Sequence, residues 1–460
     1  MKIHKITALL FIFLCFIYSK EINAQQNQNI TGIIDSIMKA NYPEENPGAS
    51  LIVMKDHELL FKAGYGKADL ENPSQKSVSN TSITSDTKFR IGSITKQFTA
   101  ISILMMLSEN KLSLDDLVSQ YYPDIFDNER PVSIRHLLSH TSGIKDLSEI
   151  KAVRQYMFTP VAPYDLIKII SEEELNFEPG STFEYSNSGY VILGGILEQV
   201  SGLSYKEFLQ ERIFDPLGMH HSHYANSSEI SGDLALGYFT RADTFVDAPD
   251  ISSSLLFAAG GIWSTVSDMA LWNEALYGNK LVDQKIIQMA FTPNKLNSGK
   301  ATDYGFGFRS CQVNDIASIE HGGGVFGYSC YGIRIKSEGV YVLILSNFER
   351  ENNYDDLVPI IAAITIEKPY VDLVEEEMNE EMAKPYLGKY LSEHGDTLSI
   401  FWNNNKLIIL QNEKEKTLKP LDTDLFRIEG SVDDRIKFNI LASNFILKRR
   451  RSMGVKASRI

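Results

Sequence analysis

Cysteine is scarce in this sequence, and its scarcity excludes one way of holding a fold together. Only three of the 460 residues are cysteine, and Cys15 belongs to an apolar N-terminal segment. Cys311 and Cys330 remain, which is too few for a fold that depends on disulfides. Their spacing leaves open whether the two pair with each other.

A basic excess is also absent. The 45 Lys and Arg residues face 59 Asp and Glu residues, which gives a formal net charge of −14 at pH 7. A field of this sign repels nucleic acid and anionic membrane surfaces, so neither is expected as a partner. The hydrophobic content of 43% and the charged content of 23% are those of an ordinary globular protein. A chain of 460 residues exceeds one ordinary core, which indicates a large domain and a smaller one.

The apolar run at the N-terminus, Ile6–Ile17, is too short to span a bilayer as a helix. It follows Lys2 and Lys5 and leads through a polar stretch to Ala24, which is the organisation of a secretory signal. We predict a Sec signal peptide over residues 1–24 and a periplasmic or secreted protein with no membrane span in its mature chain. An uncleaved anchor is the alternative.

The order of periodic segments predicts an α+β domain over residues 25–367. A helix over Asn29–Met38 precedes a hairpin of two strands, Ala49–Met54 and Glu58–Ala63. Further helices are predicted after Ser93, from Ser133, over Tyr190–Val200, from Ser204 to before Pro216, over Thr265–Leu276 and over Leu357–Ile364. Further strands are predicted over Tyr304–Cys311, Ile316–Glu320, Tyr328–Ile335 and Val340–Leu345. Pairing the hairpin with the later strands gives one mainly antiparallel sheet, flanked by the terminal helices and by a helical lobe. A cleft between lobe and sheet is the expected pocket.

After this domain the sequence predicts a linker and then a second, smaller domain made of strands. Residues 368–384 are rich in Glu and bracketed by Pro369 and Pro385, which predicts a linker. Residues 385–460 predict a small all-β barrel or sandwich without a convincing catalytic set. Its strands are expected over Tyr386–Tyr390, Thr397–Trp402, Lys406–Leu410, Leu425–Ile428, Ile436–Ile440 and Phe445–Leu447. The basic end Lys448–Arg451 is interpreted as solvated.

Ser93 and Lys96 stand three residues apart at the head of an apolar helical stretch. Positions with this spacing share one face of a helix, so the amine can reach the hydroxyl. A serine hydroxyl is a weak nucleophile that needs a base. Lysine can be that base if burial or nearby cations lower its pKa. A capping serine beside a surface lysine is the alternative for this pattern alone.

Tyr185 and Asn187 carry groups suited to the same chemistry, at the start of a predicted helix. The Tyr185 phenol can shuttle a proton if a cation such as Lys96 lowers its pKa. The Asn187 amide can hold Lys96 or a substrate amide by hydrogen bonds. The alternative is a tyrosine packed at a helix entry with asparagine as its cap.

The stretch His321–Gly327 is rich in glycine. Gly322, Gly324 and Gly327 match the dinucleotide fingerprint G-x-G-x-x-G, but a strand follows instead of a helix, which argues against nucleotide binding. Backbone without side chains here indicates an edge between strands, where a substrate can approach closely and add as a strand. The N–H of Gly324 can then act with the N–H of Ser93 as an oxyanion hole.

Together these segments resemble the serine β-lactamase/penicillin-binding-protein superfamily, and within it the class C β-lactamase-like group. The resemblance rests on Ser93-x-x-Lys96, Tyr185-Ser186-Asn187 and His321-Gly322-Gly323. Other landmarks follow in the family's order: Gly64–Asp69, His136–Gly143, Pro216–Met219, Gly260-Gly261 before Asp268, and Tyr304–Gly307. The similarity runs from about residue 30 to about residue 365.

The resemblance implies a β-lactamase/DD-peptidase-like fold and an enzyme without a metal or other cofactor. By it, Ser93 is acylated, Lys96 takes its proton, Tyr185 relays a proton to the leaving group, and the N–H groups of Ser93 and Gly324 hold the oxyanion. The residues expected to bind substrate are Asn187, His321, Gly322 and Gly323.

One position departs from the pattern, because many members have lysine where this chain has His321. Lysine is a fixed cation for a substrate carboxylate, whereas histidine is only partly charged near neutral pH. This weakens the case for penicillin-type and D-Ala-D-Ala substrates. We expect a secreted serine hydrolase whose substrate is a small molecule or peptide: a small ester, a D-amino-acid peptide, a cell-wall fragment or a β-lactam. The alternative is a catalytically silent, penicillin-binding-like sensor; the sequence leaves the oligomeric state open.

Two groups of histidines are candidate metal ligands. His220, His221 and His223 lack a carboxylate or cysteine at ligand spacing, which favours a solvated loop. His136 and His140 are four apart but lack the glutamate of the zinc-protease pattern, which favours a structural role.

Overall fold

The computed structural model describes residues 26–460 apart from 71–81, 128, 130, 242–243, 350–353, 371–377, 394, 412–413, 423, 431–433 and 450–451. The predicted signal peptide therefore lies outside the described residues, as does the middle of the predicted linker. Within the described part of the chain, no helix combines the length and the apolar character needed to cross a membrane.

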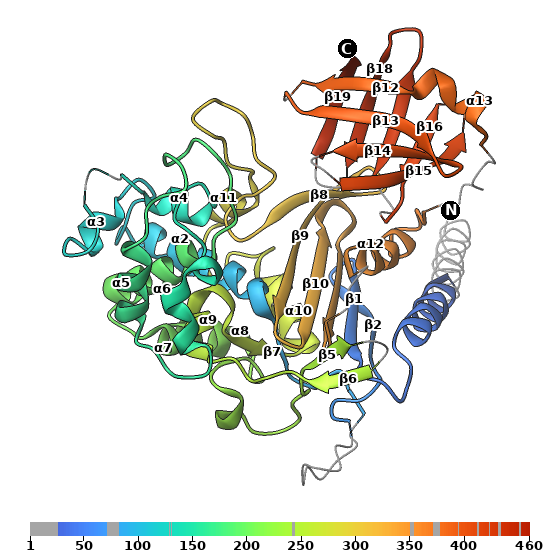
Figure 1. Ribbon diagram of the computed structural model, residues 1–460. Helices are drawn as coiled ribbons and strands as arrows, with labels where there is room; N and C mark the ends of the chain where they lie inside the picture. The colour runs from blue at the N-terminus through green and yellow to red at the C-terminus, as the bar shows by residue number, and fades with distance from the viewer. Residues whose placement is uncertain are drawn as a thin grey trace, which may run out of the picture.

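A six-stranded antiparallel sheet lies at the centre of the larger part of the chain, in the order β2-β1-β11-β10-β9-β8 (Figure 1). Its strands are β1 (Ala49–Lys55), β2 (Glu58–Tyr65), β8 (Arg309–Val313), β9 (Ile316–Val325), β10 (Tyr328–Ile335) and β11 (Val340–Ser346). Strand β1 pairs with β2 on one side and with β11 on the other, with Leu51 opposite Ile344. The predicted sheet, built from the N-terminal hairpin and the late strands, is confirmed.

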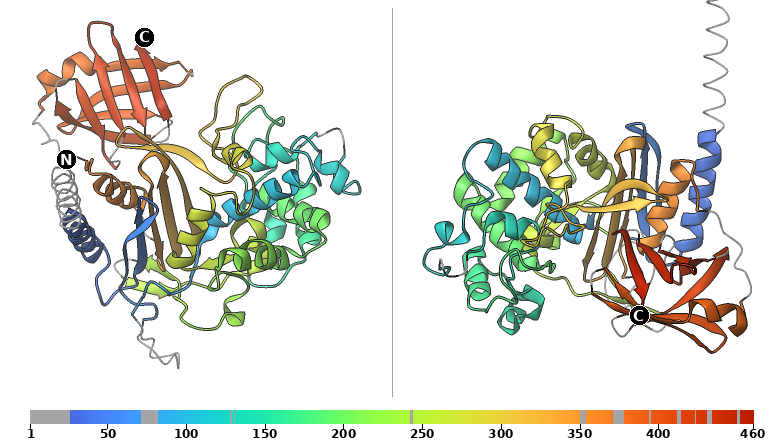
Figure 2. Two further views of the ribbon diagram at one scale, coloured as in Figure 1. Left: turned by 180° about the vertical axis from the view of Figure 1, so that it is seen from behind. Right: turned by 90° about the horizontal axis from the view of Figure 1, so that it is seen from above.

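Helices cover both faces of this sheet (Figure 2). Helical residues 26–41 and α12 (Tyr354–Thr365) lie on one face, and α10 (Val266–Ala275) and the helical lobe lie on the other. Because successive side chains of a strand point to opposite faces, Leu51 joins the core under the terminal helices and Ile52 joins the core shared with the lobe. The predicted layers are therefore confirmed.

The lobe is built around α2 and α6, which contact each other. Its helices are α2 (Thr95–Ser108), α3 (Val118–Tyr121), α4 (Ile134–Leu138), α5 (Pro163–Ser171), α6 (Asn187–Ser201), α7 (Tyr205–Leu209), α8 (Asp215–Leu217), α9 (Ser253–Gly260) and α11 (Gln284–Phe291). The first twelve residues of α2 are buried, as expected of a helix that is apolar all round. The predicted N-cap at Ser133 and the capping box of Ser204 with Glu207 are both present.

The helix predicted to end before Pro216 continues further. A π-helical turn, Gln210–Phe214, leads from α7 into α8, and Pro216 lies in the first turn of α8. Proline has no N–H to donate, and the turn directly before Pro216 departs from regular α-helical hydrogen bonding.

Some short strands were not predicted. Strands β3 (Phe89–Arg90), β7 (Ile262–Ser264) and β4 (His223–Tyr224) form a small sheet, and β5 (Tyr238–Arg241) pairs with β6 (Thr244–Asp247). The strand expected from Tyr304 begins only at Arg309, and β9 extends through His321 to Val325. Of the glycine stretch expected between strands, His321–Val325 therefore lies within β9, and Phe326 and Gly327 form the turn to β10. From His321 onward β9 pairs with β10 but no longer with β8.

The last part of the chain is a closed barrel of eight strands, as predicted for a small all-β module. They are β12 (Gly388–Ser392), β13 (Thr397–Asn403), β14 (Lys406–Gln411), β15 (Lys414–Asp422), β16 (Leu425–Ile428), β17 (Arg435–Asn439), β18 (Asn444–Arg449) and β19 (Ser452–Arg459), preceded by α13 (Glu380–Ala383). Strands β15 and β19 were missed. Of residues 414–420 only Leu418 is buried, so β15 shows almost no apolar alternation.

The two described cysteines, Cys311 and Cys330, are both buried and are not joined by a disulfide. Cys330 on β10 donates to the backbone oxygen of Arg90 at 3.3 Å. Burial raises the pKa of Cys330 to about 12, so it stays an unreactive thiol.

Candidate active site

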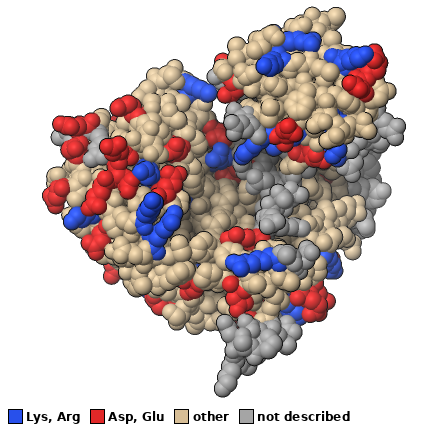
Figure 3. Space-filling view, in the orientation of Figure 1, with Lys and Arg blue, Asp and Glu red and all other residues tan. Residues whose placement is uncertain are grey.

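The face of the molecule shown in Figure 3 is hollowed between the helical lobe and the sheet. Two cavities meet at Ser93, one of about 400 Å³ and one of about 280 Å³. Ser93 and Gly324 line both. The predicted cleft between lobe and sheet is therefore present, and it contains the predicted serine.

Ser93 is carried by a single 3₁₀ turn, η1 (Gly92–Ile94), which leads directly into α2. Gly92 has a φ of 51°, and a Cβ on it would lie 2.9 Å from the backbone nitrogen of Gly324. A Cβ on Gly323 would lie 2.0 Å from the backbone oxygen of Ile91. Glycine is therefore required at both positions, and the turn that carries Ser93 lies directly against the backbone of β9.

The amine of Lys96 is enclosed by the protein, with the residue 0% exposed. Its Nζ lies 3.1 Å from Ser93 Oγ, 2.7 Å from Asn187 Oδ1 and 2.8 Å from the backbone oxygen of Ala259. Burial lowers the pKa of Lys96 from 10.5 to about 7, and the negative charge of Asp146 acts in the opposite direction. A substantial share of Lys96 is therefore uncharged at neutral pH.

These three partners suit an uncharged amine, which has two N–H groups and one lone pair. The oxygens of Asn187 and Ala259 can only accept, so they take the two N–H groups. The lone pair is then left for the hydroxyl of Ser93. The arrangement allows Lys96 to accept a proton from Ser93.

A kink in α9 turns the Ala259 carbonyl towards Lys96. Phe257 has φ 38° and ψ −131° inside this helix, a conformation that costs a bulky residue about 1–3 kcal/mol. Directly after the kink, the oxygen of Ala258 accepts from Thr99 Oγ1 at 2.7 Å, and that of Ala259 accepts from Lys96. The strained backbone thus presents two successive carbonyls to α2.

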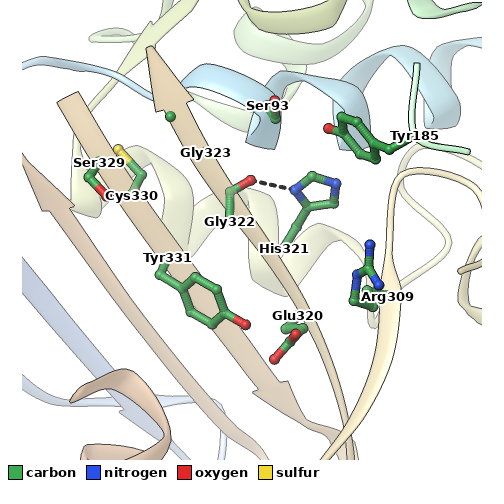
Figure 4. Close-up of a pocket in the computed structure, with 11 residues that line it drawn as sticks. Ser93, Tyr185, Arg309, Glu320, His321, Gly322, Gly323, Ser329, Cys330 and Tyr331 are labelled. Atoms are coloured by element: carbon green, nitrogen blue, oxygen red, sulfur yellow. Dashed lines mark hydrogen bonds between the residues drawn. The ribbon is translucent and has the colours of Figure 1, made fainter. Parts of the chain in front are cut away.

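Tyr185 lies beside the same amine, with its ring centroid 4.9 Å from Lys96 Nζ. In Figure 4 its hydroxyl points towards Ser93. Burial raises the pKa of Tyr185 above its ordinary 10, although the hydrogen bond between Tyr185 and Ser93 and the positive charge of Arg309 act to lower it. The pKa is therefore raised, and not lowered as expected beside a cation such as Lys96, because burial is the largest influence on it. The phenol is therefore protonated at neutral pH and is a proton donor.

Asn187 is the first residue of α6, after Ser186, which is the N-cap. Its backbone N and its Nδ2 both donate to Asp146 Oδ2, at 2.5 and 3.0 Å. Because the amide nitrogen faces this carboxylate, the amide oxygen faces Lys96. Of the two contacts expected for Asn187, the structure shows the one to Lys96. Asp146 was missed by sequence analysis. The only feature of the sequence that could have marked it as a site residue is its position just after the His136–Gly143 landmark.

His321 is held as a neutral ring. Its Nδ1 lies 2.6 Å from the oxygen of Gly322 (Figure 4), and its Nε2 lies 2.7 Å from the hydroxyl of Tyr304. A carbonyl can only accept, so Nδ1 carries the hydrogen and Nε2 accepts from Tyr304. Burial, with repulsion from Lys96, lowers the pKa of His321 to about 3. The partial charge expected for His321 near neutral pH is therefore absent.

Arg309, the first residue of β8, supplies the positive charge that His321 lacks. It lines the larger cavity together with Ser93 and Tyr185, as Figure 4 shows. Its Nη1 lies 2.5 Å from Asp303 Oδ2, which neutralises part of its charge. Sequence analysis missed Arg309, because a strand expected over Tyr304–Cys311 gives no sign of which side chains face the cleft.

The profile of the Beta-lactamase family matches residues 34–365. The chain belongs to the Beta-lactamase family. This confirms the resemblance inferred from the Ser93, Tyr185 and His321 segments.

Relatives within the Beta-lactamase family cover most of the chain. Penicillin-binding protein 4* of Bacillus subtilis (strain 168) is 28% identical over 385 residues, which are 78% of this chain and 83% of that protein. A D-aminopeptidase of Brucella anthropi is 28% identical over 310 residues, 66% of this chain but only 57% of that protein. The octameric penicillin-binding protein homologue from Pyrococcus abyssi aligns with a TM-score of 0.65 at 23% identity, over 94% of this chain and 99% of that one. The last comparison shows the shared fold.

The histidines His136 and His140 of this Beta-lactamase family member have separate structural contacts. His136 closes the capping box of α4 with Ser133. His140 accepts from the backbone N of Ser186 at 3.1 Å, and its ring lies 4.2 Å from that of Tyr185 between centroids. Burial lowers the pKa of His140 well below its usual 6.5. This neutral ring packs against Tyr185.

The other histidine group lies away from the cleft. His220 and His221 are exposed, and His221 Nδ1 is 3.6 Å from Asp268 Oδ1. Among the described residues, no three His, Cys, Asp or Glu side chains are arranged to hold a metal ion.

Proposed function

We propose that this member of the Beta-lactamase family is a serine hydrolase that works through an acyl-enzyme on Ser93. The observation that carries the proposal is the environment of Lys96. Its buried Nζ has two carbonyl acceptors and lies 3.1 Å from Ser93 Oγ, which leaves its lone pair for the serine proton. An activated serine needs a base in this position.

In the acylation step, Ser93 Oγ attacks the substrate carbonyl carbon while its proton moves to Lys96 Nζ. The N–H groups of Ser93 and Gly324 stabilise the oxyanion that forms. Tyr185 donates its proton to the leaving group and recovers one from Lys96, and the bond from the carbonyl carbon to the leaving group breaks. Expulsion of an amine needs this proton, and a phenol with a raised pKa carries it at neutral pH.

In the deacylation step, water attacks the ester carbon of the acyl-enzyme. Tyr185 takes the water proton as it passes its own proton to Lys96, and Ser93 Oγ leaves with that proton from Lys96. The free acid and the free serine are the products. The residues proposed to hold substrate beside these groups are Asn187, His321, Gly322 and Gly323.

The substrate is an ester or amide: a small ester, a D-amino-acid peptide, a cell-wall-derived fragment or a β-lactam. The neutral His321 offers no charge to a substrate carboxylate, so Arg309 takes that part in the larger cavity. The enzyme is secreted or periplasmic, by way of the signal over residues 1–24. The domains run over 25–367 and 385–460, with a linker over 368–384.

A fluorophosphonate probe and a panel of chromogenic esters, D-amino-acid amides and a chromogenic cephalosporin test the proposal. The wild type should label once and turn over at least one class, and Ser93→Ala should do neither. Equal labelling of both proteins would overturn the assignment of Ser93. Labelling of Ser93 without turnover of any compound would identify a penicillin-binding-like sensor instead of an enzyme.

A further inference from the structure

The two cavities that meet at Ser93 differ in chemistry. The larger one is lined by Tyr185, Arg309, Glu320 and His321, among others. The smaller one is lined mainly by apolar side chains, which are Leu147, Val153, Met157, Ile251, Leu255, Leu256, Ala259, Val325 and Phe326. A substrate bound at Ser93 therefore has a polar surface on one side of its reacting carbonyl and an apolar surface on the other.

The proposed mechanism assigns one cavity to each half of the substrate. Tyr185 lines the larger cavity, so a leaving group that takes its proton lies there. Asn187 lines the smaller cavity, on the other side of Ser93. The acyl part, which stays attached to Ser93, therefore extends into the smaller cavity. This assignment rests on the proposed function.

The smaller cavity is held open by contacts in its walls. The backbone oxygen of Met157 accepts from the N of Ser252 at 2.9 Å, which ties one wall to the start of α9. The ring of Phe326 lies edge to face against Phe239, with centroids 5.7 Å apart. Leu255 is 3% exposed and is fixed in the core, while Leu256 is only partly buried. The cavity is thus preformed and needs no rearrangement to accept a group.

The charges of the smaller cavity also select among acyl groups. Its polar lining consists of Ser93, Ser148, Arg154 and Asn187. Among the described residues that line it there is no carboxylate, and its one charged side chain, Arg154, is cationic. An acyl group with a free α-ammonium would enter this space without a counter-ion and against that charge, which is unfavourable away from water.

We infer that the smaller cavity is the acyl-binding site, and that it selects esters and amides whose acyl part is apolar and has no free ammonium group. N-acylated amino-acid derivatives and medium-chain acyl esters fit this description. Compounds with a free amino terminus, the substrates that the name of a D-aminopeptidase relative indicates for that protein, do not fit it.

The test compares p-nitrophenyl acetate, butyrate, hexanoate and octanoate on the full chain, the variant Leu256→Trp and the control Leu271→Trp. Leu271 lies on α10 and is 42% exposed, so the same substitution there leaves the cavity unchanged. We expect kcat/KM of the wild type to rise with chain length to hexanoate. Leu256→Trp should lower kcat/KM for hexanoate at least about tenfold and for acetate by less than about threefold.

Leu256→Ala is the second variant, since a tryptophan can prevent folding; it enlarges the cavity and should move the preference towards octanoate. A second pair of substrates tests the charge argument. N-acetyl-D-phenylalanine p-nitroanilide should be hydrolysed at least about tenfold faster, as kcat/KM, than D-phenylalanine p-nitroanilide.

The outcomes distinguish a failure of the acyl-site inference from a failure of the proposed hydrolase function. Ser93-dependent hydrolysis with a flat chain-length profile in all four proteins, or with a preference for the free amine, would overturn the acyl-site inference and leave the proposed hydrolase intact. Absence of Ser93-dependent hydrolysis of every compound would overturn both.

Discussion

Asp146 binds both N–H donors of Asn187 through a single carboxylate oxygen. Its Oδ2 lies 2.5 Å from the backbone N and 3.0 Å from Nδ2, while its Oδ1 accepts from the N of Ser148 at 2.9 Å. The carboxylate therefore fixes an amide whose own oxygen lies 2.7 Å from Nζ of Lys96, the proposed base. It also acts on Lys96 at longer range, where its charge raises the pKa of the amine.

Asp146→Asn should affect rate and pH dependence together. A rotated Asn187 amide displaces one acceptor of Lys96, and we expect kcat/KM to fall about 10- to 100-fold. Loss of the negative charge lowers the pKa of Lys96 further, so the acidic limb of the kcat/KM profile should move to lower pH. Asp165→Asn, at an exposed position on α5, is the matched control. A limb that stays in place would show that Asp146 does not act on Lys96.

The wild-type pH profile should show one ionisation near neutrality. With an uncharged ester, kcat/KM should rise with pH as Lys96 loses its proton, with an apparent pKa of about 7. His321, with a pKa of about 3, should add no ionisation between pH 5 and 9. Lys96→Ala should lower kcat by about a thousandfold or more and remove the limb. Persistence of the limb in Lys96→Ala would assign it to another group.

Two adjacent glycines should respond differently to alanine. A Cβ at Gly323 would lie 2.0 Å from the oxygen of Ile91, so Gly323→Ala must move η1 or β9. We expect a loss of stability of about 1–3 kcal/mol together with most of the activity. A Cβ at Gly324 meets no atom within 4 Å. The midpoint of urea unfolding of Gly324→Ala should therefore equal that of the wild type. Equal unfolding midpoints for the two variants would contradict this contrast.

Tyr304→Phe should reveal the contribution of the hydrogen bond between Tyr304 and His321 to stability. The hydroxyl of Tyr304 is buried, and without it the Nε2 of His321 loses its donor. We expect the free energy of unfolding to fall by about 1–3 kcal/mol in urea titration. Tyr164→Phe, at a position that is 46% exposed, should change it by less than about 0.5 kcal/mol. A similar loss in both variants would argue against a specific contribution from Tyr304.

Elements with strong local patterns could be predicted from the sequence. The hairpin at Asp56-His57, the N-cap at Ser133 and the helix end at Gly202 carry signals within a few residues, and all three are present. Strand β15 could not be predicted, because Leu418 is the only buried residue in its first seven positions. Its place in the barrel depends on pairing with β14 and β16.

Ser93, Lys96, Tyr185 and His321 were expected to lie together, because their segments follow one another in a fixed sequence order, and the structure brings them to one cleft. Arg309 and Asp146 could not be placed in the candidate site from the sequence, because their position in it depends on the direction of the side chain after the chain has folded. The pKa of Tyr185 could not be predicted either. The lowering by a nearby cation was foreseen, but the larger effect of burial depends on the whole cleft.

The left-handed backbone at Phe257 has a consequence for attempts to make this protein more robust. A substitution that lets residue 257 adopt helical φ and ψ angles would remove the strain and stabilise the fold. It would also turn the Ala259 carbonyl away from Lys96, which would then lose a hydrogen-bond acceptor. Variants selected for heat tolerance at residues 257–259 should therefore have a lower kcat than the wild type. At this position the strained backbone lowers the stability of the fold and at the same time places an acceptor for Lys96.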